Sequence, residues 1–256
     1  MQQFFKGVAM KYDLYDDNIG VVEYVQHMGE DITVVNSARV SFGKHKEQID
    51  DKDRKLIRYL IRHKHTSTLE HNVATFRFVV PLFVRSQHHR HRTFSYNEIS
   101  RRYTEENLRF YEPLSFRTQH KSNRQASNTA DLVNPIIEPD LADTTYGVTS
   151  SEKVKQHHIA SVNLYNTLMA KGVCREQARG VLPQNMYTEY YGTANLNNIL
   201  KFCSLRLHEG AQWEIQKVAE GIVGICKKLW PITMQSYIGC LEDKVLSERL
   251  EKIEVI

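Results

Sequence analysis

The segment from Arg90 to Tyr103 is dense in residues that can bind an anion. It holds four arginines, a histidine and a glutamate, with hydroxyl and amide side chains between them. A guanidinium presents a planar fork of donors that matches phosphate, and each charge-assisted hydrogen bond contributes roughly 1.5–3 kcal/mol. Helical periodicity fails from Thr93 to Ser100, so this part is predicted to be a loop that wraps a ligand.

Several interpretations of this segment are open from the residues alone. Ser95, Asn97 and Glu98 suit a ligand with phosphate, ribose hydroxyls and a base better than they suit a solvated basic face. Phe94 and Tyr96 beside arginines also suit base stacking with nucleic acid, although nearby glutamates oppose a phosphate track. A metal site is disfavoured, because the histidines of this region lack a familiar ligand spacing and are flanked by arginines.

Length and composition predict one domain with one sizeable core. The chain has 256 residues, of which 41% are hydrophobic. Its formal charge of +4 is mild, since acidic and basic residues alternate, and it suits an anionic small molecule as well as nucleic acid. No run approaches the ~20 apolar residues of a membrane span, and charge interrupts the first residues. We therefore expect a cytoplasmic protein without a membrane partner.

The remaining sequence predicts long helices and few strands. Helices are expected at about 50–63, 152–171, 195–203 and 213–229, and strands at 73–80 and 186–191. Pro81 is expected as the first residue of a short helix, Gly172 as a C-cap and Asn195 as an N-cap. A polar loop is expected at 65–68, and residues 113–151 are expected to be an irregular insertion. The predicted fold class is α+β, a small antiparallel sheet with long helices packed on it.

Arg90-His91-Arg92, followed after seven residues by Ser100, is similar to the signature of flavin-dependent thymidylate synthases. Here the match extends to Asn97, Glu98 and Arg102-Tyr103. The resemblance covers most of the chain outside the insertion. Its further matching segments are Ala38–Phe42, His65–His71, Ala178–Pro183, Asn195 and Leu205–Glu214.

This resemblance implies two overlapping sets of ligand-binding residues. Those implied to lie at FAD are Ser41, His65, Ser67, Glu70, Arg90, His91, Arg92, Asn97, Glu98, Asn195, Asn197 and Lys201. Those implied to bind dUMP are Gln87, His88, His89, Arg90, Glu98, Ile99, Ser100, Arg101, Arg102, Arg179 and Arg206. The implied catalytic residue is Arg206. Its fixed guanidinium would stabilise negative charge on the uracil around N3 and make C5 nucleophilic without a covalent enzyme adduct.

The implied reaction is the reductive methylation of dUMP to dTMP. NADPH reduces FAD, methylenetetrahydrofolate supplies the carbon unit, and the reduced flavin supplies the hydride. The resemblance also implies a homotetramer with sites shared between subunits, and neither nucleic acid nor a metal as partner. The chain departs from common family residues at Asn197, Lys201 and Gly210, where an arginine, an asparagine and a histidine are frequent.

No cysteine is predicted to act as a nucleophile. The chain has no CxxC pair among its cysteines, which are Cys174, Cys203, Cys226 and Cys240. Conventional thymidylate synthases attack the pyrimidine with a thiolate, which needs positive charge nearby in an open cleft. Cys203 lies one helical turn before Arg206, yet it shares the spacing of a packing stripe with Leu200 and Leu207. Its thiol is therefore expected in the core.

Overall fold

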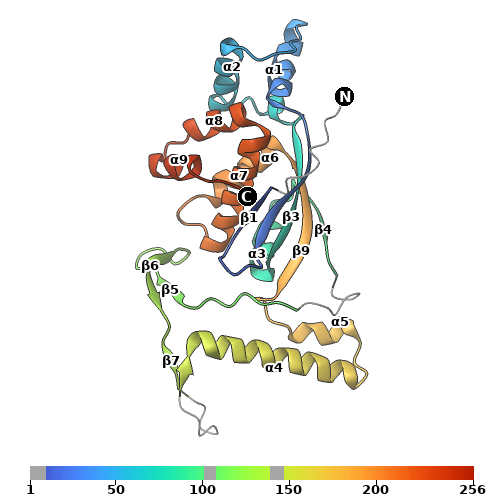
Figure 1. Ribbon diagram of the computed structural model, residues 1–256, viewed down its shortest axis with the longest axis vertical. Coiled ribbons are helices and arrows are strands. Elements are labelled where there is room, and N and C mark those ends of the chain that lie inside the picture. Colours follow the sequence, from blue (N-terminus) through green and yellow to red (C-terminus); the bar gives the residue numbers. More distant parts are fainter. Residues whose placement is uncertain (1–9, 101–107, 139–146) are drawn as a thin grey trace.

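A five-stranded antiparallel sheet forms the centre of the computed structural model, which describes residues 10–100, 108–138 and 147–256 (Figure 1). The strand order is β1-β2-β3-β9-β4. The strands are β1 (Lys11–Asp13), β2 (Val21–Met28), β3 (Val73–Pro81), β4 (Ser95–Glu98) and β9 (Tyr187–Asn195). All four pairings are antiparallel, so the predicted α+β class with a small antiparallel sheet is confirmed.

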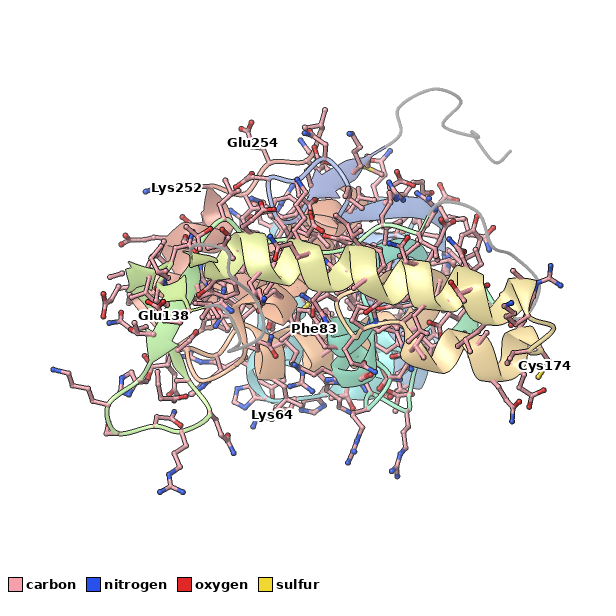
Figure 2. The ribbon with its side chains drawn as sticks, turned by 90° about the horizontal axis from the view of Figure 1, so that it is seen from below. Lys64, Phe83, Glu138, Cys174, Lys252 and Glu254 are labelled. Atoms are coloured by element: carbon pink, nitrogen blue, oxygen red, sulfur yellow. The ribbon has the colours of Figure 1, made fainter. Side chains whose placement is uncertain are left out.

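Helices lie along one side of this sheet and beyond both of its ends (Figure 1). They are α1 (Asp31–Arg39), η1 (Val40–Phe42), α2 (Asp51–Arg62), η2 (Thr66–Leu69), α3 (Leu82–His88), α4 (Ser150–Ala170), α5 (Arg175–Ala178), η3 (Arg179–Val181), α6 (Leu196–Arg206), α7 (Trp213–Leu229), α8 (Pro231–Gly239) and α9 (Lys244–Glu251). In Figure 1, α6 to α9 lie beside the sheet, α1 and α2 lie beyond its upper end, and α4 crosses below its lower end. The α4 helix also spans the view from below, where Cys174 and Glu138 lie toward opposite ends of the molecule (Figure 2).

The main core lies between the sheet and the helices α6 and α7. Phe76 and Phe78 of β3 and Phe202 of α6 are fully buried there. Burying each such side chain contributes about 1.5–3 kcal/mol. Gly192 of the neighbouring strand β9 lies against the Phe78 ring. A side chain does not fit there, because a Cβ atom would lie only 2.9 Å from that ring. The small residue lets the aromatic rings of β3 and β4 approach β9 closely.

Local capping residues define the helix boundaries that the sequence predicts. The Asp50 side chain accepts from the backbone N–H groups of Lys52 and Asp53 and begins α2. Asn195 accepts from the N–H of Asn198 and begins α6. Gly172 follows the C-cap of α4 with a φ of 86°, the left-handed region that favours glycine. The helix starts at Asp50 and Asn195 are confirmed. The predicted positions of Gly172 and Pro81 are each displaced by one residue, since Lys171 is the C-cap of α4 and Pro81 is the N-cap of α3 and not its first residue.

The predicted loop over Thr93–Ser100 is wrong, since this segment contains the edge strand β4. Its residues pair with β9, from Ser95 opposite Thr193 to Glu98 opposite Tyr190. A short edge strand has few core contacts, so its sequence shows little apolar periodicity. Tyr96 alone of this strand is half-buried, and its hydroxyl donates to the carbonyls of His88 and His91 at 2.8 and 3.1 Å.

The irregular insertion predicted at 113–151 is partly ordered into two small sheets. One pairs β5 (Phe116–Gln119) with β6 (Ser127–Val133), and the other pairs β7 (Ile136–Ile137) with β8 (Val148–Thr149). These strands are mostly exposed, so they lack the apolar alternation that predicts a strand. The polar loop predicted at 65–68 is largely the short helix η2. Among the described helices, none is long and apolar enough to cross a membrane.

Candidate functional site

Arg206 is the last residue of α6, and neighbouring groups fix its guanidinium. Its Nε donates to Nε2 of His91 at 3.0 Å, and its Nη2 donates to the carbonyl oxygen of Gln87 at 3.3 Å. The side chain is half-buried, and this burial lowers the pKa of Arg206 from its ordinary value. Arginine still remains charged at physiological pH. The site therefore contains a fixed positive charge in a partly dehydrated position.

His91 is the neutral partner of this guanidinium. It accepts at Nε2, so its ring proton lies on Nδ1. Burial, and then the charge of Arg206, lowers the pKa of His91 to about 4. The buried ring of His88 also lies nearby, with its centroid 6.4 Å from that of His91. At neutral pH the uncharged His91 ring can therefore orient Arg206 without opposing its positive charge.

We expect His91 to titrate near pH 4 and not near the unperturbed 6.5. The unfolded chain binds this proton more readily, so the stability contributed by neutral His91 is present above about pH 6.5 and is lost as the pH falls toward 4. NMR titration of the imidazole signals, with His91→Gln for assignment, measures the value. Arg206→Ala should raise it by removing one of its two causes, and a parent midpoint near 6.5 would contradict the geometry.

His88 does not occupy the substrate-facing position predicted from the sequence. Its side chain is fully buried, and its Nδ1 lies 2.8 Å from the hydroxyl of Tyr190. The ring packs against Phe78 and Phe202, with centroids 4.8 and 4.6 Å apart, and burial holds its pKa well below the usual range. The predicted contact with dUMP is therefore corrected, because α3 directs this ring into the core. His88 instead supports the turn that carries His91.

Glu98 and His89 stabilise the same turn and the edge strand beside it. Glu98 accepts from the Thr188 hydroxyl at 2.7 Å and lies 3.1 Å from Nε of Arg85. The half-buried ring of His89 stacks on Tyr96 with centroids 4.1 Å apart. Burial is the main cause that lowers the pKa of His89. These contacts connect α3 and the turn that follows it to the strand β4.

Further predicted binding residues lie along the surface of this turn and strand. Arg90, Arg92, Asn97 and Ile99 are exposed, and Ser100 is half-buried. Neither guanidinium forms an ion pair with another residue in the described part of the chain. Arg101 and Arg102 lie outside the described residues.

A second group of predicted residues lies at the start of α6. The Asn197 side chain donates to Glu70 Oε1 at 2.9 Å, joining α6 to the end of η2. The exposed residues of η2 and its N-cap include His65 and Ser67, and Lys201 is exposed one turn further along α6. Asn195 uses its side-chain oxygen as the helix cap.

Helix α6 connects the two groups. Asn197 lies near its beginning and Arg206 at its end. Nine residues of α-helix span about 14 Å. This is a distance that an extended ligand can bridge, so one rigid element positions both groups.

Ser41 and Arg179 are not brought to Arg206 within this chain. Ser41 lies on η1, which packs against α1, and Arg179 is an exposed residue of η3, which packs against α4 and α5. Within the described residues, no hydrogen bond or ion pair connects either residue to Arg206. In residues 10–100, 108–138 and 147–256, no group of three or more His, Cys, Asp or Glu residues could hold a metal ion.

Sequence reasoning gave no role to Gln212 and Glu214, which adjoin the site. Nε2 of Gln87 donates to Oε1 of Gln212, and Nε2 of Gln212 donates to Oε2 of Glu214 at 2.9 Å. The only sequence signal was their place in the matching segment Leu205–Glu214. An acidic residue in the first turn of a helix is ordinarily an exposed partner of the helix dipole. Here it is buried.

Known proteins are similar to this chain over most of its length. The family model described as "Thymidylate synthase complementing protein" matches residues 23–232. A flavin-dependent thymidylate synthase of Thermus thermophilus is 41% identical over 232 residues, covering 91% of this chain and 80% of the relative. One from Thermotoga neapolitana is 37% identical over 219 residues, covering 86% of this chain and 91% of the relative.

A solved structure shows the same fold. The UMP/dUMP methylase PolB from Streptomyces cacaoi, bound with 5-Br dUMP, has a TM-score of 0.70 and 31% sequence identity. The alignment covers 89% of this chain and 97% of PolB. The family model and the curated relatives both extend over most of the chain, and the residues that the family model matches include Arg206, His91, Gln87 and all of α6. The chain therefore belongs to the family of flavin-dependent thymidylate synthases.

Proposed function

We propose that this protein methylates dUMP to dTMP, with methylenetetrahydrofolate as carbon donor and NADPH-reduced FAD as hydride source. The observation that carries the proposal is the guanidinium of Arg206, fixed by neutral His91 and the Gln87 carbonyl. A preorganised donor of this kind stabilises negative charge as it develops on the pyrimidine. The names of the relatives and of PolB support the same reaction class.

The exposed donors of the site fit a flavin dinucleotide. Arg90 and Arg92 offer guanidinium groups without an ion pair among the described residues, which suits a diphosphate. Lys201, which is exposed on α6, can meet the more distant part of the same molecule. Asn197 is buried and donates to Glu70, so its role is to hold η2 against the start of α6. The bound flavin supplies the hydride chemistry.

Flavin binding gives a simple test of the cofactor. Purified protein should be yellow after incubation with FAD, and its visible absorbance band should bleach when NADPH is added without oxygen. An Arg90→Ala, Arg92→Ala double variant should bind FAD more weakly, since both charges are proposed to meet the diphosphate. Folded parent protein that stays colourless and takes up no FAD would overturn the assignment.

The nucleotide is proposed to lie between Arg206 and the strand β4. Gln87 lies on α3 and Glu98 on β4, and Ile99 and Ser100 directly follow that strand. Arg101, Arg102 and Arg179 complete the proposed set for dUMP, the first two as sequence predictions outside the described residues. Cytoplasmic location and a single domain likewise stay sequence predictions.

We also propose a homotetramer whose sites are shared between subunits. Within the described residues, no hydrogen bond or ion pair connects Arg179 to Arg206, so we propose a second copy of the chain as the source of this charge. Val40 and Phe42 of η1, and Leu205 next to Arg206, leave large apolar side chains exposed. Such surfaces favour burial against another copy of the chain.

A variant with all four cysteines changed to alanine is expected to keep making dTMP. Cys203 is fully buried and its Sγ lies 4.0 Å from the Ala219 carbonyl oxygen, and burial raises the pKa of this thiol. Cys226 is buried in the same core. Turnover is measured in folded, FAD-loaded protein. A loss reproduced by Cys203→Ala alone would identify a thiolate nucleophile and refute the mechanism.

A further inference from the structure

The buried carboxylate of Glu214 collects donors from separate parts of the chain. Nη2 of Arg117 donates to both of its oxygens at 2.8 and 2.9 Å, and the Tyr111 hydroxyl donates to Oε1 at 3.1 Å. Gln212 adds the bond to Oε2 at 2.9 Å. The Glu214 side chain is 4% exposed. A carboxylate with this set of donors is rigid, and it can only accept hydrogen bonds.

This carboxylate sets the direction of two amide groups in succession. Because Glu214 only accepts, Gln212 must direct its NH₂ group toward it and turn its oxygen to Gln87. Gln87 must then donate its own NH₂ group to that oxygen. The remaining polar atom of the Gln87 amide is its carbonyl oxygen Oε1, which no described residue contacts as a donor.

Gln87 lies directly beside the proposed catalytic group. It is a half-buried residue of the last turn of α3, and its backbone carbonyl accepts from Arg206 at 3.3 Å. Its side-chain amide therefore extends from the residue whose backbone the guanidinium contacts. An acceptor there pairs with an N–H or O–H group of a nucleotide, whereas a reversed amide presents a donor to it.

The other side of Glu214 is connected to the β5–β6 hairpin. Arg117 of β5 also donates from Nε to the Ser127 hydroxyl of β6 at 2.9 Å. Its guanidinium lies 5.3 Å from the centre of the Trp213 ring at the start of α7. The hairpin, whose role the sequence does not reveal, is thus joined to the site through one buried ion pair.

We propose that Glu214, supported by Arg117 of the hairpin, is a positioning residue that makes Gln87 present its carbonyl oxygen to the nucleotide beside Arg206. This inference rests on the proposed function. Glu214 acts through Gln212 and Gln87 and does not itself contact the substrate. The hairpin contributes by holding the carboxylate in place.

The decisive variant is Glu214→Gln, which keeps the size of the side chain but can donate as well as accept. The two amides can then reverse, so kcat/KM for dUMP should fall at least about tenfold while FAD content is unchanged. Glu220→Gln is the matched control. Glu220 is equally buried on the same helix and binds Lys217, and its variant should stay within about twofold of the parent.

A double-mutant cycle with Gln87→Ala separates positioning from general destabilisation. If Glu214 acts through Gln87, adding Glu214→Gln to Gln87→Ala should change kcat/KM by less than about twofold. Gln212→Leu interrupts the series of amides but leaves Glu214 its bonds to Arg117 and Tyr111. It should behave in the same way, and it replaces Glu214→Gln if that variant does not fold. The proposal would be overturned if Glu214→Gln and Gln212→Leu both kept the kcat/KM of the parent. It would also be overturned if either substitution lowered kcat/KM by the same factor in the Gln87→Ala background as in the parent.

The ligand-free protein provides a readout that does not depend on turnover. The side-chain amide protons of Gln87, assigned in ¹⁵N NMR spectra with Gln87→Ala, should exchange slowly in the parent and quickly in Glu214→Gln. Unchanged exchange would overturn the proposal. A parent that makes no dTMP would refute the proposed function instead, and the amide exchange would then still decide whether Glu214 positions Gln87.

Discussion

Replacing Arg206 with alanine is expected to lower the rate of dTMP formation at least about 100-fold while folding and flavin binding persist. The guanidinium is half-buried and is fixed by His91 and Gln87, so its charge is already oriented when the pyrimidine becomes negative. Losing such a group costs most in the transition state. The measurement is dTMP release with dUMP saturating.

Controls for this experiment come from another arginine and from the cofactor. Arg249 of α9 is also partly exposed and faces the buried Glu220 at 3.5 Å, so Arg249→Ala removes a comparable charge at a different place. It should keep turnover within a few-fold of the parent. Arg206→Ala must retain the flavin absorbance of the parent. Turnover within a few-fold of the parent would show that Arg206 does not activate the nucleotide.

The largest expected loss of stability follows Trp230→Ala. Trp230 is fully buried at the junction of α7 and α8, and its Nε1 donates to the Gly29 carbonyl at 2.8 Å. Removing a buried tryptophan costs about 3–5 kcal/mol in the free energy of unfolding. Urea denaturation, compared through the midpoint and slope, measures this cost.

Two further variants separate packing from hydrogen bonding at this position. Trp230→Phe keeps most of the buried volume but leaves the Gly29 carbonyl without its donor, which costs about 1–3 kcal/mol. Val245→Ala removes an exposed side chain of α9 and should change stability by no more than about 0.5 kcal/mol. A loss below about 1 kcal/mol for Trp230→Ala would mean that this junction is not part of the stabilising core.

The sequence predicted those parts of the fold that depend on local chemistry. Asp50, Gly172 and Asn195 mark helix ends because their own side chain or backbone conformation satisfies the terminal groups. Strand β4 was missed because an exposed edge strand has little apolar pattern. The β5–β6 hairpin was missed for the same reason, since β6 is mostly exposed and has little apolar alternation.

The candidate site was predictable in its residue types and less so in its burial. The arginine-rich segment predicted an anion site, and the resemblance brought in Arg206, which the structure places against His91. Nothing in the sequence separates the buried His88 from its neighbours, because the direction of each ring is set by the packing of α3 on the sheet. The bond between Arg117 and Glu214 joins residues 97 positions apart, so no local pattern reveals it.

The most direct test measures dTMP formed by FAD-loaded protein supplied with dUMP, methylenetetrahydrofolate and NADPH. We expect one dTMP for each NADPH consumed, with formation abolished when FAD is removed and restored when it is returned. The cysteine-free variant should give the same result. Folded, flavin-loaded protein that forms no dTMP under these conditions, or dTMP formation that continues without flavin, would contradict the proposed function.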